Sequence, residues 1–295
     1  MGRVHKRGQS VYTTAMWTAL KILAFLGLCY AAVIVWMYIS QRKMLYYPKQ
    51  EMTASPDDIG LAHEDIWMTT RLGTRIHGWW LPHHAPRFTL LFSHGNGGNL
   101  SHRLDTLRIL HDLEVNVLVY DYSGYGQSQG EPGEAATAAD VRAAWDWLVQ
   151  EQGIAPKSII LFGRSLGGAV AAGLVAELAG NAQIPVALIM ESTFTSVPDM
   201  GAYMYPWLPV RLLARYRYDS VTNLTGLDLP GLFLHSQNDE IIPYALGRRL
   251  HKSYQGPKTF LELSGDHNSG FLASGTLYPE GLNHFLSSLE KGSDR

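Results

Sequence analysis

From about residue 66 onward, short apolar runs alternate with longer helical patterns, and this alternation leaves few folds open. The first two runs, 66–70 and 75–81, flank Gly73 and predict an antiparallel pair of strands. Further strands are predicted at 88–93, 115–121, 158–162, 186–190, 232–235 and 259–263, and helices at 100–113, 134–152, 166–178, 244–254 and 277–289. Because the later strands are apolar almost throughout, the pattern predicts an α/β fold: a mostly parallel sheet, eight-stranded in type, with helices on both faces.

Residues 193–228 interrupt the alternation and are rich in aromatic side chains. We expect them to form a small cap insertion over the carboxyl ends of the strands, where doubly wound sheets place their sites. The whole chain is then divided into an N-terminal tail (1–14), a transmembrane anchor (15–40), a linker (41–60) and one large domain (61–291).

The predicted anchor rests on residues 22–39, ILAFLGLCYAAVIVWMYI, which carry no charge. As a helix they would extend about 27 Å, close to the ~30 Å hydrocarbon core of a bilayer. Trp17 lies before this run, and Trp36 and Tyr38 lie at its far end, as expected of aromatic side chains at membrane interfaces. The run is longer than the apolar region of a cleaved signal peptide, and Ser-Gln-Arg-Lys follows it instead of small residues. We therefore expect the lipid bilayer to be a partner of the chain through residues 22–39.

Basic residues do not decide the orientation of the predicted anchor at 15–40, because the counts on its two sides are nearly tied. Before it stand Arg3, Lys6 and Arg7, and after it Arg42, Lys43 and Lys49. The commoner arrangement for such a protein keeps the short tail inside. We therefore expect a single-pass membrane protein whose large domain lies on the non-cytoplasmic side.

The charge and cysteine content exclude several classes of function. The formal net charge is −2, from 24 basic and 26 acidic side chains, so no field of one sign attracts nucleic acid. The single cysteine, Cys29, cannot form an intrachain disulfide or a CxxC motif. No H-E-x-x-H motif is present either, and we expect neither a metal nor a cofactor.

Two segments match the G-x-S-x-G pattern of a nucleophilic serine, one centred on Ser165 and one on Ser128. The chemistry requires a strand, a sharp strained turn and then a helix. Ser165 follows the strand SIILF and opens the helix LGGAVAAGLVAEL, whereas Ser128 runs into Glu131-Pro132-Gly133. Ser165 is thus the predicted nucleophile, and Ser128 is interpreted as a polar turn residue.

A serine hydroxyl needs a base, and on this fold the order along the chain is serine, acid, histidine. His267 lies in a loop just after the last predicted strand, whereas the other downstream histidines lie in strand or helix patterns. The preceding strand is followed by Asp239 and Glu240. We predict His267 as the general base and Asp239 as the acid, with Glu240 as the alternative acid.

Two backbone N–H groups are expected to bind the oxyanion of the tetrahedral intermediate. One belongs to Leu166, directly after the nucleophile, and the other to Asn96 in the loop SHGNGGN. Gly95 and Gly97 are expected to let this loop turn its amides inward. His94 precedes the nucleophile, so a structural hydrogen-bonding role is expected for it.

The motifs SHGNGGN, VYDYSGYGQSQGEP, LFGRSLGGAVA, ESTF, SQNDEIIP and GDHN occur in the order and spacing of the α/β-hydrolases. Over residues 15–290 the chain most resembles single-pass, membrane-anchored α/β-hydrolase-domain serine hydrolases related to the eukaryotic protein depalmitoylases. The resemblance implies the triad Ser165, Asp239 and His267, with Asn96 and Leu166 as the oxyanion hole. Where the depalmitoylases carry an N-terminal cysteine cluster, this chain has an apolar helix.

These observations predict a serine hydrolase that cleaves an ester or thioester of a lipid or an acylated protein through an acyl-enzyme. Two alternatives remain at this point. A serine peptidase or aminopeptidase could use the same triad, and a non-catalytic membrane scaffold could have kept the fold.

Overall fold

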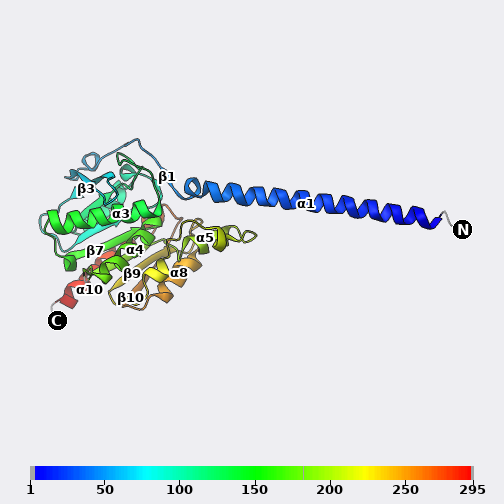
Figure 1. The fold of residues 1–295 in the computed structure, drawn as a ribbon. Coiled ribbons are helices and arrows are strands. Elements are labelled where there is room, and N and C mark those ends of the chain that lie inside the picture. The colour runs from blue at the N-terminus through cyan, green and yellow to red at the C-terminus, as the bar shows by residue number, and fades with distance from the viewer. Residues whose placement is uncertain (1–3, 182, 294–295) are drawn as a thin grey trace. The chain divides into compact units, whose positions relative to one another are not determined.

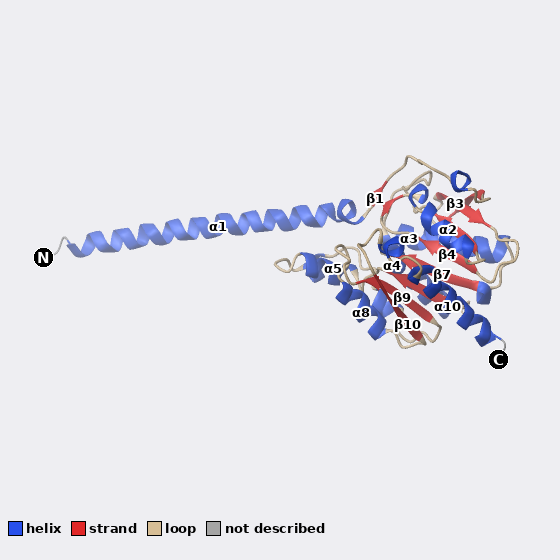
Figure 2. Ribbon diagram, turned by 180° about the vertical axis from the view of Figure 1, so that it is seen from behind, coloured by secondary structure: helices blue, strands red, loops and turns tan. Residues whose placement is uncertain are grey.

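The computed structural model describes residues 4–181 and 183–293 and contains one eight-stranded sheet within them, in the order β10-β9-β8-β7-β4-β6-β3-β2 (Figures 1 and 2). Its strands are β2 (Glu64–Thr69), β3 (Arg75–Leu81), β4 (Thr89–Ser93), β6 (Asn116–Tyr120), β7 (Ile159–Arg164), β8 (Ala187–Glu191), β9 (Gly231–Ser236) and β10 (Lys258–Leu263). In the sheet order from β10 to β6, which includes β4, every pair of neighbouring strands is parallel. Strand β3 is antiparallel to both β2 and β6. The mostly parallel sheet and the opening antiparallel pair predicted from the sequence are confirmed.

Helices cover the sheet on both faces, as the apolar strands require (Figure 2). The longer helices are α2 (Leu104–Asp112), α3 (Glu134–Asp146), α4 (Leu166–Gly180), α8 (Tyr244–Ser253) and α10 (Leu277–Ser293). Strand β7 explains the arrangement, because its successive side chains point to opposite faces. Ile159 and Leu161 join the core under α3, α4 and α8, while Ile160 and Phe162 join the core under α2 and α10.

The cap insertion between β8 and β9 contains three short helices: α5 (Val197–Met204), α6 (Val210–Leu213) and α7 (Ser220–Asn223). Periodicity over so few residues did not predict them. The helix predicted at 134–152 also differs, because α3 ends at Asp146 and a π-helical turn, η3 (Trp147–Glu151), continues it.

The N-terminal helix α1 (Val4–Leu45) includes a stretch, Thr14–Leu45, that is long and apolar enough to cross a membrane. The predicted anchor at 15–40 lies within it, and Val4 to Thr14 of the predicted tail are also helical. Residues 1–3 of that tail lie outside the described residues.

The stretch predicted as a linker is packed against the large domain from Tyr46 onward. It contains the short strand β1 (Tyr47–Pro48) and the 3₁₀ helix η1 (Pro56–Ile59). Tyr46 and Pro56 are both buried. Strand β1 pairs in parallel with β5 (Gly97–Gly98), a second short strand in the loop after β4.

Candidate active site

Ser165 occupies the sharp turn between β7 and α4. Its backbone has φ 55° and ψ −121°, a conformation that L-residues rarely adopt. The turn is held from both sides, because the N–H of Ser165 donates to Glu191 O at 2.8 Å and its carbonyl accepts from Thr193 Oγ1 at 2.8 Å. The geometry is that of a strand–turn–helix elbow.

The two glycines of the pattern are required by close packing. A Cβ on Gly163 would lie 2.3 Å from Gly167 O, and a Cβ on Gly167 would lie 1.9 Å from Ser93 O. Any side chain at either position would therefore push the elbow away from the sheet. This requirement explains why glycine stands on both sides of Ser165.

His267 and Asp239 reach Ser165 from the ends of two other strands. His267 Nε2 lies 3.1 Å from Ser165 Oγ, and His267 Nδ1 lies 2.7 Å from Asp239 Oδ2. Because a carboxylate only accepts, Nδ1 carries the proton toward Asp239 and Nε2 faces the serine hydroxyl as an acceptor. The structure thus brings together the three residues that sequence reasoning selected, in one chain of hydrogen bonds.

Asp239 is buried and held in its ionised form. Burial alone would raise its pKa, but hydrogen bonds from His235, His267 and the N–H of Ile242 outweigh burial, and the pKa lies well below its ordinary value. His235 Nε2 lies 2.9 Å from Ile242 O and 3.3 Å from Asp239 Oδ2. The carboxylate is therefore fixed in position and charge beside His267.

Sequence reasoning missed two supports of this arrangement. His235, which lies in a strand pattern, is placed beside Asp239, and its position four residues before Asp239 was the available signal. Glu240, the alternative acid, instead accepts the N–H of His267 at 3.0 Å and so holds the histidine loop. Asp266, next to His267, accepts the N–H groups of Asn268 and Ser269 and so has a structural role in the turn.

The loop and the helix that carry the expected oxyanion donors both lie next to Ser165. Leu166 is the first residue of α4, so its N–H is at a helix N-terminus. The loop carrying Asn96 passes close to the serine, because a Cβ on Gly95 would lie 3.5 Å from Ser165 Cβ. The positive φ of this loop is at Gly98, at 83°.

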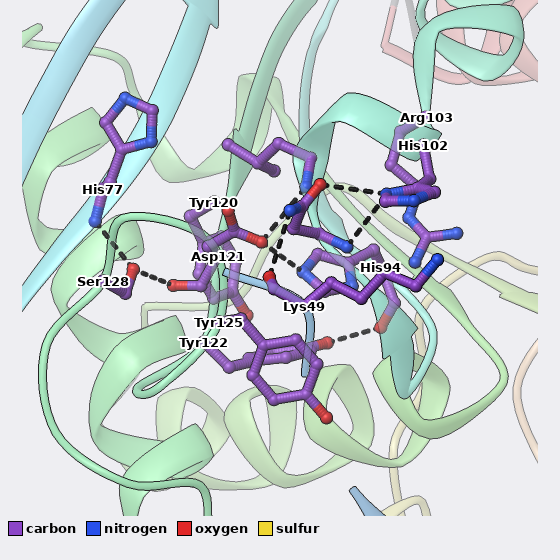
Figure 3. A network of polar contacts seen from close by, with 12 residues as sticks. Lys49, His77, His94, His102, Arg103, Tyr120, Asp121, Tyr122, Tyr125 and Ser128 are labelled. Atoms are coloured by element: carbon purple, nitrogen blue, oxygen red, sulfur yellow. Dashed lines mark hydrogen bonds and ion pairs between the residues drawn. The ribbon is translucent and has the colours of Figure 1, made fainter. Parts of the chain in front are cut away.

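A buried polar network lies behind this loop (Figure 3). His94 Nδ1 donates to Gly95 O at 2.7 Å, and its Nε2 faces Asp121 at 3.3 Å, so His94 has the structural role expected. Ser128 Oγ donates to Asp121 O and accepts the N–H of His77. Ser128 is therefore a buried residue that braces the fold, and neither of its two hydrogen bonds involves the predicted nucleophile, Ser165.

A cavity of about 390 Å³ lies elsewhere, between β2 and the helical segment formed by α3 and η3. Trp67, Arg142 and Trp147 are among its lining residues, and none of the five predicted site residues is. Among the described residues, no cluster of three or more His, Cys, Asp or Glu side chains could hold a metal ion.

An elbow turn on a mostly parallel eight-stranded sheet defines an α/β-hydrolase fold. Solved structures agree: an esterase from Pyrococcus furiosus superposes with a TM-score of 0.67 at 17% identity, covering 83% of this chain and 98% of that one. An α/β hydrolase from Vibrio vulnificus gives 0.65 at 22% identity, covering 78% and 82%.

Sequence relatives define the family. An uncharacterised protein of Mycobacterium tuberculosis is 35% identical over 272 residues, covering 91% of this chain and 95% of the relative. The α/β-hydrolase domain-containing protein WAV2 of Arabidopsis thaliana is 32% identical, covering 81% and 84%. Residues 84–225 also match the family described as serine aminopeptidase, S33. The chain belongs to the α/β-hydrolase superfamily.

Proposed function

We propose that the chain is a membrane-anchored serine hydrolase that cleaves carboxylic esters or thioesters. The observation that carries the proposal is the hydrogen-bond chain from Ser165 through His267 to Asp239, with the serine on a strained elbow. Esterases among the structural neighbours support an ester as the substrate class. The apolar helix supports anchoring in a bilayer through residues 22–39, and we assign the large domain to the non-cytoplasmic side.

In this mechanism Ser165 Oγ attacks the acyl carbonyl carbon while His267 Nε2 takes the hydroxyl proton. Asp239 holds the imidazole in the required tautomer and stabilises the imidazolium. The N–H groups of Asn96 and Leu166 stabilise the oxyanion of the tetrahedral intermediate.

His267 then gives its proton to the departing alcohol or thiol as the bond to the carbonyl carbon breaks. This leaves an acyl group on Ser165 Oγ. A water molecule then attacks the carbonyl carbon of the acyl-enzyme while His267 takes one of its protons. The second tetrahedral intermediate collapses, His267 returns the proton to Ser165 Oγ, and the carboxylic acid is released.

Labelling with a fluorophosphonate tests the proposed nucleophile. The full chain in detergent should react covalently, Ser165→Ala should not, and Ser128→Ala should label like the wild type because Ser128 only braces the fold. Loss of label in folded Ser128→Ala with retention in Ser165→Ala would refute the assignment. A folded wild type that neither labels nor hydrolyses would favour a non-catalytic scaffold.

A peptidase is the second candidate, because the matching family is described as serine aminopeptidase. Rates on an acyl ester, an acyl thioester and an aminoacyl amide of similar size separate the two. Our proposal expects hydrolysis of the ester and thioester. Hydrolysis of the aminoacyl amide alone would assign the chain to the peptidases.

A further inference from the structure

The residues that follow α1 contact the loop expected to form the oxyanion hole. We call residues 45–51 the junction segment and residues 93–99 the oxyanion loop. Strand β1 of the junction segment pairs in parallel with β5 of the oxyanion loop, aligning Tyr47 with Gly97 and Pro48 with Gly98. None of the motifs that mark the fold lies in the junction segment, so no sequence pattern connects it with the site.

Asn96 is held by the junction segment at two points. The N–H of Tyr47 donates to Asn96 O at 3.1 Å, and Asn96 Nδ2 donates to Leu45 O at 2.9 Å. Two residues further on, Lys49 N donates to Gly98 O at 3.2 Å. The junction segment therefore holds the side chain of Asn96 and the carbonyl of its peptide bond to Gly97, directly next to the N–H that we assign to the oxyanion.

Interior donors hold the remaining carbonyls of the oxyanion loop. His94 O accepts from Tyr122 Oη at 2.6 Å, Gly95 O accepts from His94 Nδ1, and Gly97 O accepts from Arg103, while Asn96 O also accepts from Tyr125 Oη at 2.8 Å. A trans peptide is planar, so fixing each C=O also fixes the opposite direction of the next N–H. The Asn96 N–H shares a peptide unit with Gly95 O, which His94 holds, and the carbonyl of Asn96, held by Tyr47 and Tyr125, orients the neighbouring N–H of Gly97.

The junction segment is itself rigidly attached. Tyr46 is only 4% exposed, and its hydroxyl lies 2.8 Å from that of Tyr218 in the cap insertion. Tyr218 Oη lies 2.7 Å from Thr137 Oγ1 on α3. Asn99 Nδ2 donates to the carbonyls of Lys49 at 3.0 Å and Glu51 at 2.7 Å. A support fixed at several points can hold the oxyanion loop in one conformation.

We propose that the junction segment positions the oxyanion loop, so that hydrolysis depends on the stretch of chain immediately after the N-terminal helix. The inference rests on the proposed function. Tyr47 and Tyr46 act as positioning residues: neither touches the substrate, and they act through Asn96.

The first test removes one backbone donor. Tyr47→Pro deletes the N–H that donates to Asn96 O, and Pro48 already restricts residue 47 to the extended region that proline tolerates. Tyr47→Ala is the matched control, because it removes the exposed side chain and keeps the N–H. In the full chain, kcat for p-nitrophenyl butyrate should fall about 10- to 100-fold in Tyr47→Pro, with little change in KM.

The second test uses isosteric variants that fold readily. Tyr46→Phe removes the hydroxyl contact that fixes the junction segment, and Tyr254→Phe removes a buried hydroxyl that donates to Leu229 O at 2.5 Å, away from the loop. An alkyl trifluoromethyl ketone adds to the serine hydroxyl and forms a tetrahedral oxyanion. Its affinity therefore reports directly on the oxyanion hole. Tyr46→Phe should weaken its binding several-fold more than it changes KM, and Tyr254→Phe should not.

The outcomes separate this inference from the proposed function. A wild-type chain that does not hydrolyse the ester would overturn both. An active wild type together with a folded, fully active Tyr47→Pro would overturn this inference alone. If Tyr47→Pro does not fold, unchanged kcat and unchanged ketone affinity in Tyr46→Phe would overturn it.

Discussion

Ser165 combines a reactive position with an unfavourable backbone. Its φ of 55° and ψ of −121° suit glycine, which has no Cβ to clash. Such conformations cost on the order of 1–3 kcal/mol and persist only where the surroundings impose them. Here the imposed contacts are the hydrogen bonds to Glu191 O and from Thr193. The placement of the Ser165 hydroxyl on a strained turn thus lowers the stability of the fold.

Ser165→Gly should therefore be more stable than Ser165→Ala. Both variants lack the hydroxyl, but only glycine relieves the strain, and we expect a difference of about 1 kcal/mol after the extra unfolded-state entropy of glycine is subtracted. Urea unfolding of the two full-length variants in the same detergent measures it. Equal stabilities would mean that the turn stores no strain.

Ser128 shows how a pattern match can mark structure instead of chemistry. Its buried Oγ joins the N–H of His77 on β3 to the carbonyl of Asp121 at the end of β6. Ser128→Ala leaves both backbone groups without this partner, so it should lower the free energy of unfolding by about 1–3 kcal/mol. Chemical denaturation checks this value, and a variant as stable as the wild type would contradict the bracing role.

Helix α3 is tied to the loop after β6 by a buried carboxyl group. Asp140 accepts the N–H of Ser123 at 2.8 Å and its Oγ at 2.7 Å, and it is fully buried. Burial raises its pKa from 3.8 to about 7, although both bonds from Ser123 act in the opposite direction. This connection therefore titrates near neutral pH.

The sign of the resulting pH dependence follows from proton binding. Between about pH 4 and 7 the folded chain keeps a proton on Asp140 that the unfolded chain releases, so this carboxyl group makes the fold less stable as pH rises. Asp140→Asn cannot titrate. Its stability relative to the wild type should thus increase from pH 5 to pH 8, by a few kcal/mol at most. Thermal unfolding curves at several pH values test this, and a constant difference would contradict the raised pKa.

For the molecule as a whole, the sequence predicted the sheet because both faces of its strands are buried, which makes each strand an apolar run. The five site residues could be selected because strand ends and loop order restrict where a nucleophile, a base and an acid can meet. Longer-range packing was not predictable in this way. The roles of Glu240 and the junction segment depend on contacts between distant parts of the chain, and no local pattern marks such contacts.

We expect the N-terminal helix to anchor this domain at a membrane, and substitutions at the centre of the helix test that anchoring. Two arginines in Ala31→Arg/Ala32→Arg would each oppose insertion by about 2.5–3.5 kcal/mol, whereas Ala31→Leu/Ala32→Leu would favour it. We expect the wild type and the leucine variant to stay in membranes washed with carbonate, and the arginine variant to be largely released. Intact-mass measurement of the membrane-bound chain should show that residues 22–39 are still present. Because the positions lie far in sequence from the junction segment, the released arginine variant should still label with a fluorophosphonate. A wild-type chain cleaved beyond residue 39 would instead make the helix a signal sequence.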